Sequence, residues 1–354
     1  MRCTVIHIVK RFGRVGGMET YVWHLVHGLV TRGFQVAVVC EQVFESPGDG
    51  VDVIEVEASV ERPRWKSMMT FRTRVDQKIR EVFFGQSVLI HSHERSLCHQ
   101  VTTFHGPPID PPRYSRWLSR FNKRFMAWQQ FERDELLGPS VQMVLPVSGQ
   151  IKKQLTDRYP EIVDKAVVLA WPGIDNSELN SSVYKPICLD KARFVFVGKE
   201  WRRKGLDIAV RVVAEFRRTH PGATLTVFGV DAHGLPRSIL GFDWVSYRSW
   251  TPSIPWLDYD LLLHPARKEP FGMVVAEARS NGLPVLMSSQ VGAADLEFSN
   301  TKILDLSDPI RCWSEAAREL ASLPDSKPET KWTWNDLVTK HTKIIYPQLE
   351  MISL

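Results

Sequence analysis

The sequence has no long apolar run, no paired cysteine motif and no internal repeat. The lack of about 18 consecutive apolar residues excludes a membrane-spanning helix. The five cysteines are scattered, without a CxxC pair or zinc-like spacing, which predicts reduced, mostly buried thiols. The apolar stretch within residues 1–10 is too short and too β-branched for a signal peptide. We therefore expect a cytoplasmic protein whose membrane contact, if any, is peripheral.

The composition is that of a folded globular protein. The 354 residues exceed what one hydrophobic core usually serves, so two domains are expected. Hydrophobic residues make up 44% and charged residues 24%, which permits a core of normal size. The net charge of +5 indicates an anionic partner but does not choose between nucleotide, nucleic acid and membrane.

Strand and helix patterns alternate twice along the chain. Residues 5–9 predict a strand, residues 18–31 a helix and Gln35–Cys40 another strand, which is one βαβ unit. The same order restarts with a strand at 193–198 and a helix at 205–219. Alternation of this kind predicts parallel sheets, here in two α/β, Rossmann-like, doubly wound domains. We place them at 1–172 and 173–331, followed by an amphipathic helix within about 332–354.

Two turns between a strand and a helix are suited to phosphate. The first contains Gly16 and Gly17, and the second contains Lys199, Arg203 and Lys204. Backbone N–H groups at a helix N-terminus attract phosphate, and cations placed there are unfavourable unless an anion neutralises them. A plain tight turn and a solvated charge run are the alternative interpretations.

Two glutamates, Glu269 and Glu277, flank a Pro/Gly loop and the start of a predicted helix. Glu277 lies among apolar residues, so partial burial is expected, and a buried carboxylate needs a partner. Sugar hydroxyls donate well to carboxylates. An ordinary solvated helix glutamate is the alternative.

With its flanking residues, Glu269 through Glu277 resembles the E-x7-E motif of retaining GT-B glycosyltransferases of family 4 (group 1). The turn Arg203-Lys204-Gly205 is similar to the diphosphate-binding R-K-G turn of that family, and the segment ending at His105-Gly106 is similar to its T-x-H-G segment. The resemblance spans nearly the whole chain and is strongest to the enzymes that build lipopolysaccharide core.

The resemblance implies a GT-B fold, with two domains facing across a cleft, and a role for each matching residue. Domain 1–172 would take the acceptor, and 173–331 the nucleotide-sugar donor, for which a UDP-sugar such as UDP-glucose is favoured. The C-terminal helix would pack back on the first domain. Catalysis would use His105, Glu269 and Lys204, with retention and without metal or cofactor. The donor would be held by the following residues: Gly16, Gly17, Lys199, Arg203, Lys204, Glu269, Phe271, Gly272, Met273 and Glu277.

Within these roles, Lys204 with Arg203 or Lys199 would neutralise the diphosphate, and Glu277 would accept the ribose hydroxyls. His105 would contact the donor sugar or the incoming hydroxyl. One departure is Lys199, where many relatives have arginine, because lysine lacks the bidentate fork that suits phosphate. A D-x-D sequence, Asp258-Tyr259-Asp260, could hold a metal, but it leads directly into a predicted buried strand.

A basic, aromatic segment lies between residues 62 and 133, where cations outnumber acids 14 to 5. Trp117, Phe121, Phe125 and Trp128 share one predicted helical face. In one interpretation, the aromatic residues belong to the core and the cations are solvated. In the other, the segment is a surface that meets either anionic lipid on the cytoplasmic face of the inner membrane or a phosphorylated acceptor. The sequence contains no recognised nucleic-acid-binding module, so nucleic acid is not expected as a partner.

Three functions remain open. The first is transfer of a sugar to a glycan or glycolipid acceptor, in lipopolysaccharide core or other cell-surface polysaccharide synthesis. The second is a nucleotide-sugar epimerase on the same scaffold. The third is a non-catalytic nucleotide-sugar-binding protein, which the joint presence of His105, Lys204, Glu269 and Glu277 disfavours.

Overall fold

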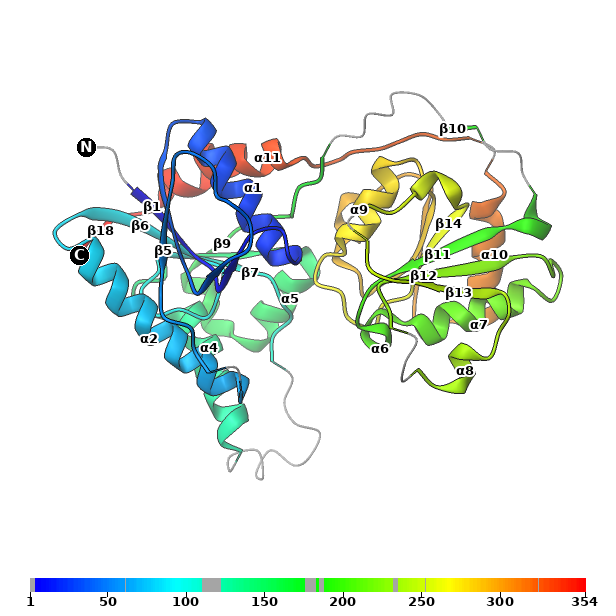
Figure 1. Ribbon diagram of the computed structural model, residues 1–354, viewed down its shortest axis with the longest axis horizontal. Helices are drawn as coiled ribbons and strands as arrows, with labels where there is room; N and C mark the ends of the chain where they lie inside the picture. Colours follow the sequence, from blue (N-terminus) through cyan, green and yellow to red (C-terminus); the bar gives the residue numbers. More distant parts are fainter. Residues whose placement is uncertain are drawn as a thin grey trace. The chain divides into compact units, whose positions relative to one another are not determined.

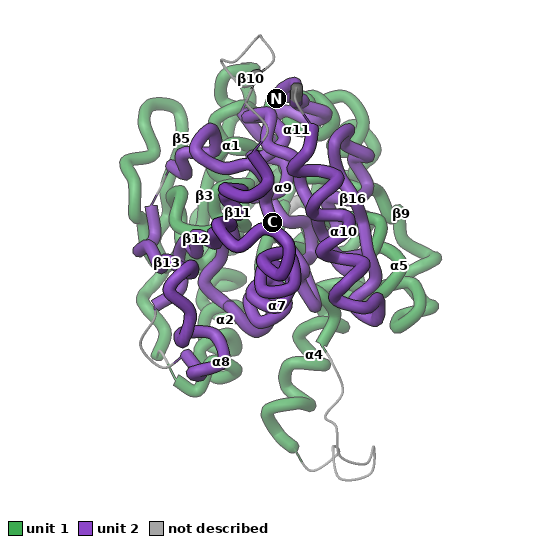
Figure 2. The backbone as a smooth tube through the Cα atoms, turned by 90° about the vertical axis from the view of Figure 1, so that its right-hand side faces the viewer, with its two compact units in different colours: residues 1–173, 334–354 green, residues 174–333 purple. Residues whose placement is uncertain are grey.

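The computed structural model describes residues 4–60, 62–109, 122–175, 183–184, 188–231, 235–251, 253–323 and 325–354. The chain forms two compact units, coloured separately in Figure 2. Unit 1 comprises Met1–Gly173 and Trp334–Leu354, and unit 2 comprises Ile174–Thr333. The C-terminal segment therefore returns to the unit in which the chain begins (Figure 1).

Unit 1 is built on a parallel sheet with the strand order β5-β3-β1-β6-β7-β8-β9. A last strand, β18, pairs with β6 antiparallel. The strands are β1 (Thr4–Ile8), β3 (Gln35–Cys40), β5 (Val51–Glu55), β6 (Ser87–Ser92), β7 (Val101–Phe104), β8 (Met143–Pro146), β9 (Ala166–Val167) and β18 (Ile352–Ser353). Nearly every residue of β1, β3, β6, β7 and β8 is buried, as expected for parallel strands covered on both faces.

Helices cover both faces of this sheet. They are α1 (Gly17–Thr31), α2 (Arg64–Val82), α4 (Lys123–Leu137), α5 (Gly149–Arg158) and α11 (Trp334–Lys340). Phe71, Val75 and Ile79 of α2 pack with Ile6 and Ile8 of β1 in one core cluster. Short segments complete the unit: β2 (Arg11–Phe12), β4 (Gln42–Val43), and the helical turns Pro160–Asp164, His341–Ile345 and Tyr346–Gln348.

Unit 2 is built on a second parallel sheet, with the order β13-β12-β11-β14-β15-β16. Its strands are β11 (Arg193–Val197), β12 (Thr224–Phe228), β13 (Val245–Arg248), β14 (Leu261–His264), β15 (Val285–Ser288) and β16 (Thr301–Leu304). Its helices are α6 (Trp201–Lys204), α7 (Leu206–Phe216), α8 (Arg237–Leu240), α9 (Met273–Ser280) and α10 (Ile310–Ala321). A small pair, β10 (Val183–Tyr184) and β17 (Asp325–Ser326), and the turns Leu189–Lys191, Trp256–Asp258 and Gly292–Leu296 complete it.

The two parallel sheets confirm the prediction of two doubly wound α/β domains. In each unit the carboxyl ends of neighbouring strands lie along one edge of the sheet, where ligands bind in folds of this class. In unit 2, α7 and α10 share one core cluster around Trp313. The buried residues of α9 lie outside that cluster, and α9 follows β14 directly at the carboxyl edge.

Some local predictions were wrong. The basic stretch expected as a turn forms the one-turn helix α6. Gly205, at φ +80°, ends α6 and precedes α7, so the two helices are separate. Cys40 and Cys98 are buried as expected, but Cys188 and Cys312 are exposed.

Of the aromatic face expected in the basic segment, Trp117 and Phe121 lie outside the described residues. Phe125 and Trp128 are half-buried on α4, with the Arg95 guanidinium 5.2 Å from the centre of the Trp128 ring. Membrane association stays a prediction. Within the described ranges, no helix combines the length and the apolar composition needed to cross a membrane.

Candidate active site

The first group of candidate residues lies after β11, at the carboxyl edge of the unit 2 sheet. Gly198 follows the strand, and α6 then brings Arg203 and Lys204 back toward it. A Cβ atom on Gly198 would lie 2.1 Å from Cδ of Lys204, so the lysine stem runs directly over this glycine. This close approach restricts the path of the Lys204 side chain, which is mostly buried. Lys199 is exposed and forms no ion pair among the described residues.

Glu269 lies at the centre of a charged cluster. Its Oε2 is 3.1 Å from Nζ of Lys204, 3.1 Å from Nη1 of Arg203 and 3.5 Å from Nε2 of His264. Burial alone would raise the pKa of this carboxyl, but Lys204, His264 and Arg203 together hold it well below its usual range. Glu269 is therefore a fixed anion that holds two cations in place. Arg203 also contacts Glu200 and donates to the carbonyl of Lys268.

The loop after Glu269 leads into the N-terminus of α9. Gly272 caps this helix at φ +97°, a conformation that side chains other than glycine rarely adopt. No hydrogen bond between described residues uses the amide N–H of Phe271, Gly272 or Met273. Unpaired N–H groups at a helix N-terminus can donate to an anion or to sugar oxygens. They follow Glu269 in the chain, so amide donors and the charged cluster share the carboxyl edge of the sheet.

Glu277, four residues into α9, has a different environment from Glu269. Burial raises its pKa, against the effect of Lys204 and with a contribution from Asp175. Burial therefore acts against the ionised form of this carboxyl. No ion pair to Glu277 occurs in the part of the chain that the structure describes. A half-buried carboxylate of this kind gains most from hydroxyl donors supplied by a ligand.

In unit 1, the glycine pair begins α1. A Cβ on Gly16 would lie 2.5 Å from Oε2 of Glu19, a buried carboxylate that pairs with Arg11, so a side chain here would have to displace that carboxylate. A Cβ on Gly17 would meet no atom within 4 Å. Packing therefore accounts for Gly16 but not for Gly17, which leaves open space above the first amides of the helix.

His105 follows β7 in unit 1 and is half-buried. Its Nε2 is 3.1 Å from Nδ1 of His93, and the ring of Tyr21 stands edge-on to it at 4.9 Å between centroids. Burial lowers the pKa of His105 well below that of a free imidazole, so the ring is neutral. The sequence singled out His105 but gave no indication of its neighbours.

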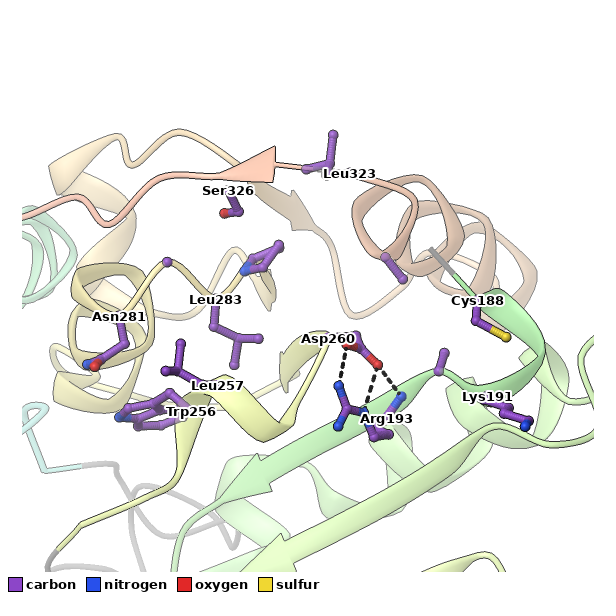
Figure 3. Close-up of a pocket in the computed structure, with 14 residues that line it drawn as sticks. Cys188, Lys191, Arg193, Trp256, Leu257, Asp260, Asn281, Leu283, Leu323 and Ser326 are labelled. Carbon is purple, nitrogen blue, oxygen red and sulfur yellow. Dashed lines mark hydrogen bonds and ion pairs between the residues drawn. The ribbon is translucent and has the colours of Figure 1, made fainter. Parts of the chain in front are cut away.

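A separate cavity of about 360 Å³ lies at the opposite, amino edge of the unit 2 sheet (Figure 3). Arg193 and Asp260, at the starts of β11 and β14, form its best-defined polar contact. Asp260 accepts from the backbone N–H of Arg193 at 2.9 Å and from its guanidinium at 3.1 and 3.2 Å. This ion pair accounts for Asp260 of the D-x-D sequence without a metal, and the cavity is distinct from the cluster around Glu269.

Two family models match the two halves of the chain. Residues 15–178 match Glycosyltransferase Family 4, and residues 191–322 match Glycosyl transferases group 1. The chain belongs to the glycosyltransferases. The boundary between the two matches falls close to the boundary between the two compact units.

The enzyme is also similar to curated and solved proteins. It is 24% identical over 325 residues to a glycogen synthase of Mycobacterium tuberculosis, covering 78% of this chain and 75% of that protein. The crystal structure of WaaG, a glycosyltransferase involved in lipopolysaccharide biosynthesis, superposes with a TM-score of 0.71 at 18% identity, over 97% of this chain and 96% of that one. Anabaena HepE in complex with UDP and glucose superposes with a TM-score of 0.62 at 14% identity, over 97% and 99%. These likenesses confirm the GT-B fold.

The sequence missed two features of the candidate site. The sequence analysis gave no role to His264, at the end of β14, yet the ring of this histidine contacts Glu269. The Arg11–Glu19 pair was not anticipated, although Glu19 lies two residues after the glycine pair. A buried acid needs a partner, and here the partner is a cation.

Proposed function

We propose that the enzyme transfers a sugar, with retention, from a nucleotide-diphosphate donor to a glycan or glycolipid acceptor. A UDP-sugar is the favoured donor, and lipopolysaccharide core or another cell-surface polysaccharide is the favoured product. The observation that carries the proposal is the cluster of Lys204, Arg203 and Glu269 beside the unpaired amides at the start of α9. Cations and helix amides together are suited to a diphosphate leaving group.

Each group has a task in this reaction. The acceptor hydroxyl oxygen forms a bond to the anomeric carbon as the bond between that carbon and the phosphate oxygen breaks. The electron pair of the broken bond leaves with the diphosphate, which can take up the hydroxyl proton. Lys204 and Arg203 then stabilise the added negative charge. Glu269 keeps both cations in position and accepts from the sugar, and Glu277 accepts from the two ribose hydroxyls. The protein supplies these charges itself, and we propose neither a metal nor a cofactor.

In unit 1, we assign Gly17 to the diphosphate because its open side permits close approach of a ligand to the first amides of α1. His105 contacts the donor sugar or the incoming hydroxyl. Lys199 is exposed and can add to the positive field around the phosphates without a fixed contact.

A ligand-stabilisation screen against UDP-, GDP- and ADP-sugars identifies the donor. At a concentration of about 100 times the dissociation constant, a ligand of the folded protein adds roughly 2.7 kcal/mol of stability. Product analysis with and without acceptor then separates transfer from epimerisation, because an epimerase changes the donor alone. No stabilisation by any nucleotide sugar would contradict the proposal.

The two glutamates provide the sharper test. Glu277→Gln should weaken nucleotide binding by roughly ten- to hundred-fold, because glutamine offers one acceptor oxygen where the carboxylate offers two. Glu269→Gln should act more on the transfer rate, since it removes the anion that holds Lys204 and Arg203. Binding of free nucleotide by calorimetry, transfer rate and thermal midpoint are measured for both variants. Wild-type binding by Glu277→Gln would refute the ribose assignment, and an unfolded Glu277→Gln would make Glu277 a structural residue.

A further inference from the structure

Three histidines of unit 1 form a continuous hydrogen-bonded chain. His7 lies near the end of β1, His93 follows β6, and His105 follows β7, and these three strands are neighbours in the sheet. Nδ1 of His7 is 3.1 Å from Nε2 of His93, and Nδ1 of His93 is 3.1 Å from Nε2 of His105. His7 and His93 are buried, so the chain runs from the interior to the half-buried candidate residue His105.

Neighbouring groups hold the middle ring of this chain in place. His91 stacks on His93 with 4.2 Å between ring centroids. His91 is itself fixed at both nitrogens, by the Tyr346 hydroxyl at 2.9 Å and the Thr103 hydroxyl at 2.8 Å. Free rotation of His93 would therefore break two hydrogen bonds and a stacked contact.

The same cluster could be taken for a metal site, because one ring nitrogen each of His7, His91 and His93 lie within 4.8 Å of one another. Hydrogen bonds already occupy both nitrogens of His91 and both nitrogens of His93. A metal would have to break bonds in two of its three ligands before it could bind. The observed contacts favour a hydrogen-bonded chain over a metal centre.

The chain restricts where protons can lie. Burial lowers the pKa of all three imidazoles, so each ring is neutral and has one N–H and one bare nitrogen. Two hydrogen bonds in series then share one direction. If His7 donates to His93, then His93 donates to Nε2 of His105, and the proton of His105 lies on Nδ1. In the reverse direction, that proton lies on Nε2.

The buried end of the chain distinguishes the two directions. Nε2 of His7 is buried and has no hydrogen-bond partner among the described residues. In the reverse direction this nitrogen would be an N–H without an acceptor, whereas in the forward direction it is only a bare lone pair. Buried N–H groups without an acceptor are rarer in proteins than acceptors without a donor. The forward direction is therefore favoured.

We propose that His7 and His93 are positioning residues that hold His105 in its Nδ1–H tautomer, so that its ring presents a hydrogen-bond donor to the sugar substrate. This inference rests on the proposed function, because it assigns to His105 a contact with substrate. His93 acts through His105 and does not itself touch the substrate.

Nitrogen NMR of the wild-type protein tests the tautomer directly, without any assay of transfer. With 15N-histidine labelling, protonated and bare ring nitrogens have well-separated shifts, and His105→Gln identifies the His105 resonances. The expected result is one tautomer of His105 with the proton on Nδ1. A proton on Nε2, or a mixture of tautomers in the wild type, would overturn the proposal.

His93→Phe then tests the cause, since phenylalanine keeps the stacked ring but has no nitrogen. The Nδ1–H form of His105 should fall to half or less, which lowers kcat/KM by about two- to tenfold. His93→Asn should restore most of the wild-type tautomer, because its amide nitrogen can replace Nδ1 as the donor to His105. His99→Phe is the matched control, because His99 is another buried, neutral histidine of unit 1. Among the described residues, its ring bonds only to Ser96 and the Glu135 carbonyl.

An unchanged His105 tautomer in folded His93→Phe would refute the positioning role. The NMR result and the proposed function fail separately. If the wild type binds no nucleotide sugar, the function is wrong whatever the tautomer. If His105→Gln transfers sugar normally, the substrate contact of His105 is wrong, and the further inference falls with it even where the tautomer is as expected.

Discussion

Lys204 and Arg202 carry the same charge and lie in the same short helix, yet their surroundings differ. Lys204 is mostly buried, runs over Gly198 and pairs with Glu269. Arg202 is exposed, and its guanidinium lies 4.5 Å from the centre of the Trp201 ring. A binding site for diphosphate therefore predicts unequal effects of removing the two charges, whereas a solvated charge run predicts equal ones.

Lys204→Ala should weaken binding of the nucleoside diphosphate by roughly ten- to hundred-fold, because a charge-assisted hydrogen bond is lost. Arg202→Ala should change the dissociation constant by less than about twofold, since a surface charge contributes little. Titration calorimetry of both variants measures the difference. Equal, negligible effects would leave α6 as an ordinary basic surface.

The sequence identified Lys204, Arg203 and Glu269 of the charged cluster, but not their electrostatics. The motif marked Glu269 and Glu277 as a pair, whereas the structure lowers the pKa of the first and raises that of the second. The difference arises because α6 brings Lys204 and Arg203 to Glu269, a contact between segments far apart in sequence. The histidine chain was unpredictable for the same reason, since it depends on β1, β6 and β7 being neighbours.

At the scale of elements, periodicity predicted the strands and long helices well because their buried faces are regular. It placed α1 at residues 18–31, and the helix spans Gly17–Thr31. Periodicity could not predict α6, since four residues do not establish a period. It also gave one continuous C-terminal helix, whereas α11 ends at Lys340 and continues as the wider turn His341–Ile345.

The packing of α11 on α1 depends on one glycine. A Cβ on Gly28 would lie 2.4 Å from Cγ2 of Val338, and the same two helices are joined by the stacked rings of His24 and Trp334. Arg32 of the following turn donates to Asn335 and Thr339. Gly28 thus permits the close approach of the helix that returns from unit 2.

Gly28→Ala should destabilise unit 1 by about 1–3 kcal/mol through overpacking. The sign is informative, because glycine to alanine inside a helix otherwise stabilises by about 1 kcal/mol. Adding Val338→Ala, which removes the clashing methyl groups, should recover part of the loss. A double-mutant cycle on the thermal midpoint measures this coupling. Stabilisation by Gly28→Ala alone would contradict the packing of α11 on α1.

At the scale of the molecule, the alternation of strands and helices predicted two domains with boundaries at 172/173 and near 332. The compact units divide at Gly173/Ile174 and at Thr333/Trp334. A sequence pattern can place such boundaries because parallel strands recur on both sides of the loop-rich stretch. The same pattern cannot show which polar residues become buried. Unit 1 buries several imidazoles, those of His7, His91, His93, His99 and His341.

These imidazoles determine how stability depends on pH. Burial lowers the pKa of His7 to about 3 and of His99 and His341 to about 4, and it lowers those of His91, His93, His105 and His264 as well. A histidine in the unfolded chain has a pKa of about 6.5, so below that pH the unfolded chain binds more protons than the folded protein does. Burial of these histidines in their neutral form therefore contributes its full stability above about pH 6.5, and this contribution is lost as the pH falls toward about 4.

Carboxyls whose pKa is raised by burial act in the opposite direction but are fewer among the described residues. Burial raises the pKa of Glu94 and of Glu135 to about 7, and it also raises that of Glu277. These groups keep a proton in the folded state more readily than in the unfolded chain. The contribution of Glu94 and Glu135 to stability is therefore lost as the pH rises through about 7. Among the described residues, seven histidines with a lowered pKa outnumber three glutamates with a raised pKa, so acid should destabilise the protein between about pH 6.5 and 4.5.

Proton uptake on unfolding measures this balance without assuming that both units unfold together. Titrations of folded and urea-unfolded protein should differ by more than about one proton near pH 5.5, equivalent to more than about 1.4 kcal/mol of stability per pH unit. His99→Gln removes one buried imidazole that does not belong to the histidine chain ending at His105. The glutamine amide can form hydrogen bonds to the same partners, Ser96 and the Glu135 carbonyl. This variant should take up close to one proton fewer. Equal uptake by the variant and the wild type would mean that His99 is already protonated in the folded state and that burial does not keep it neutral.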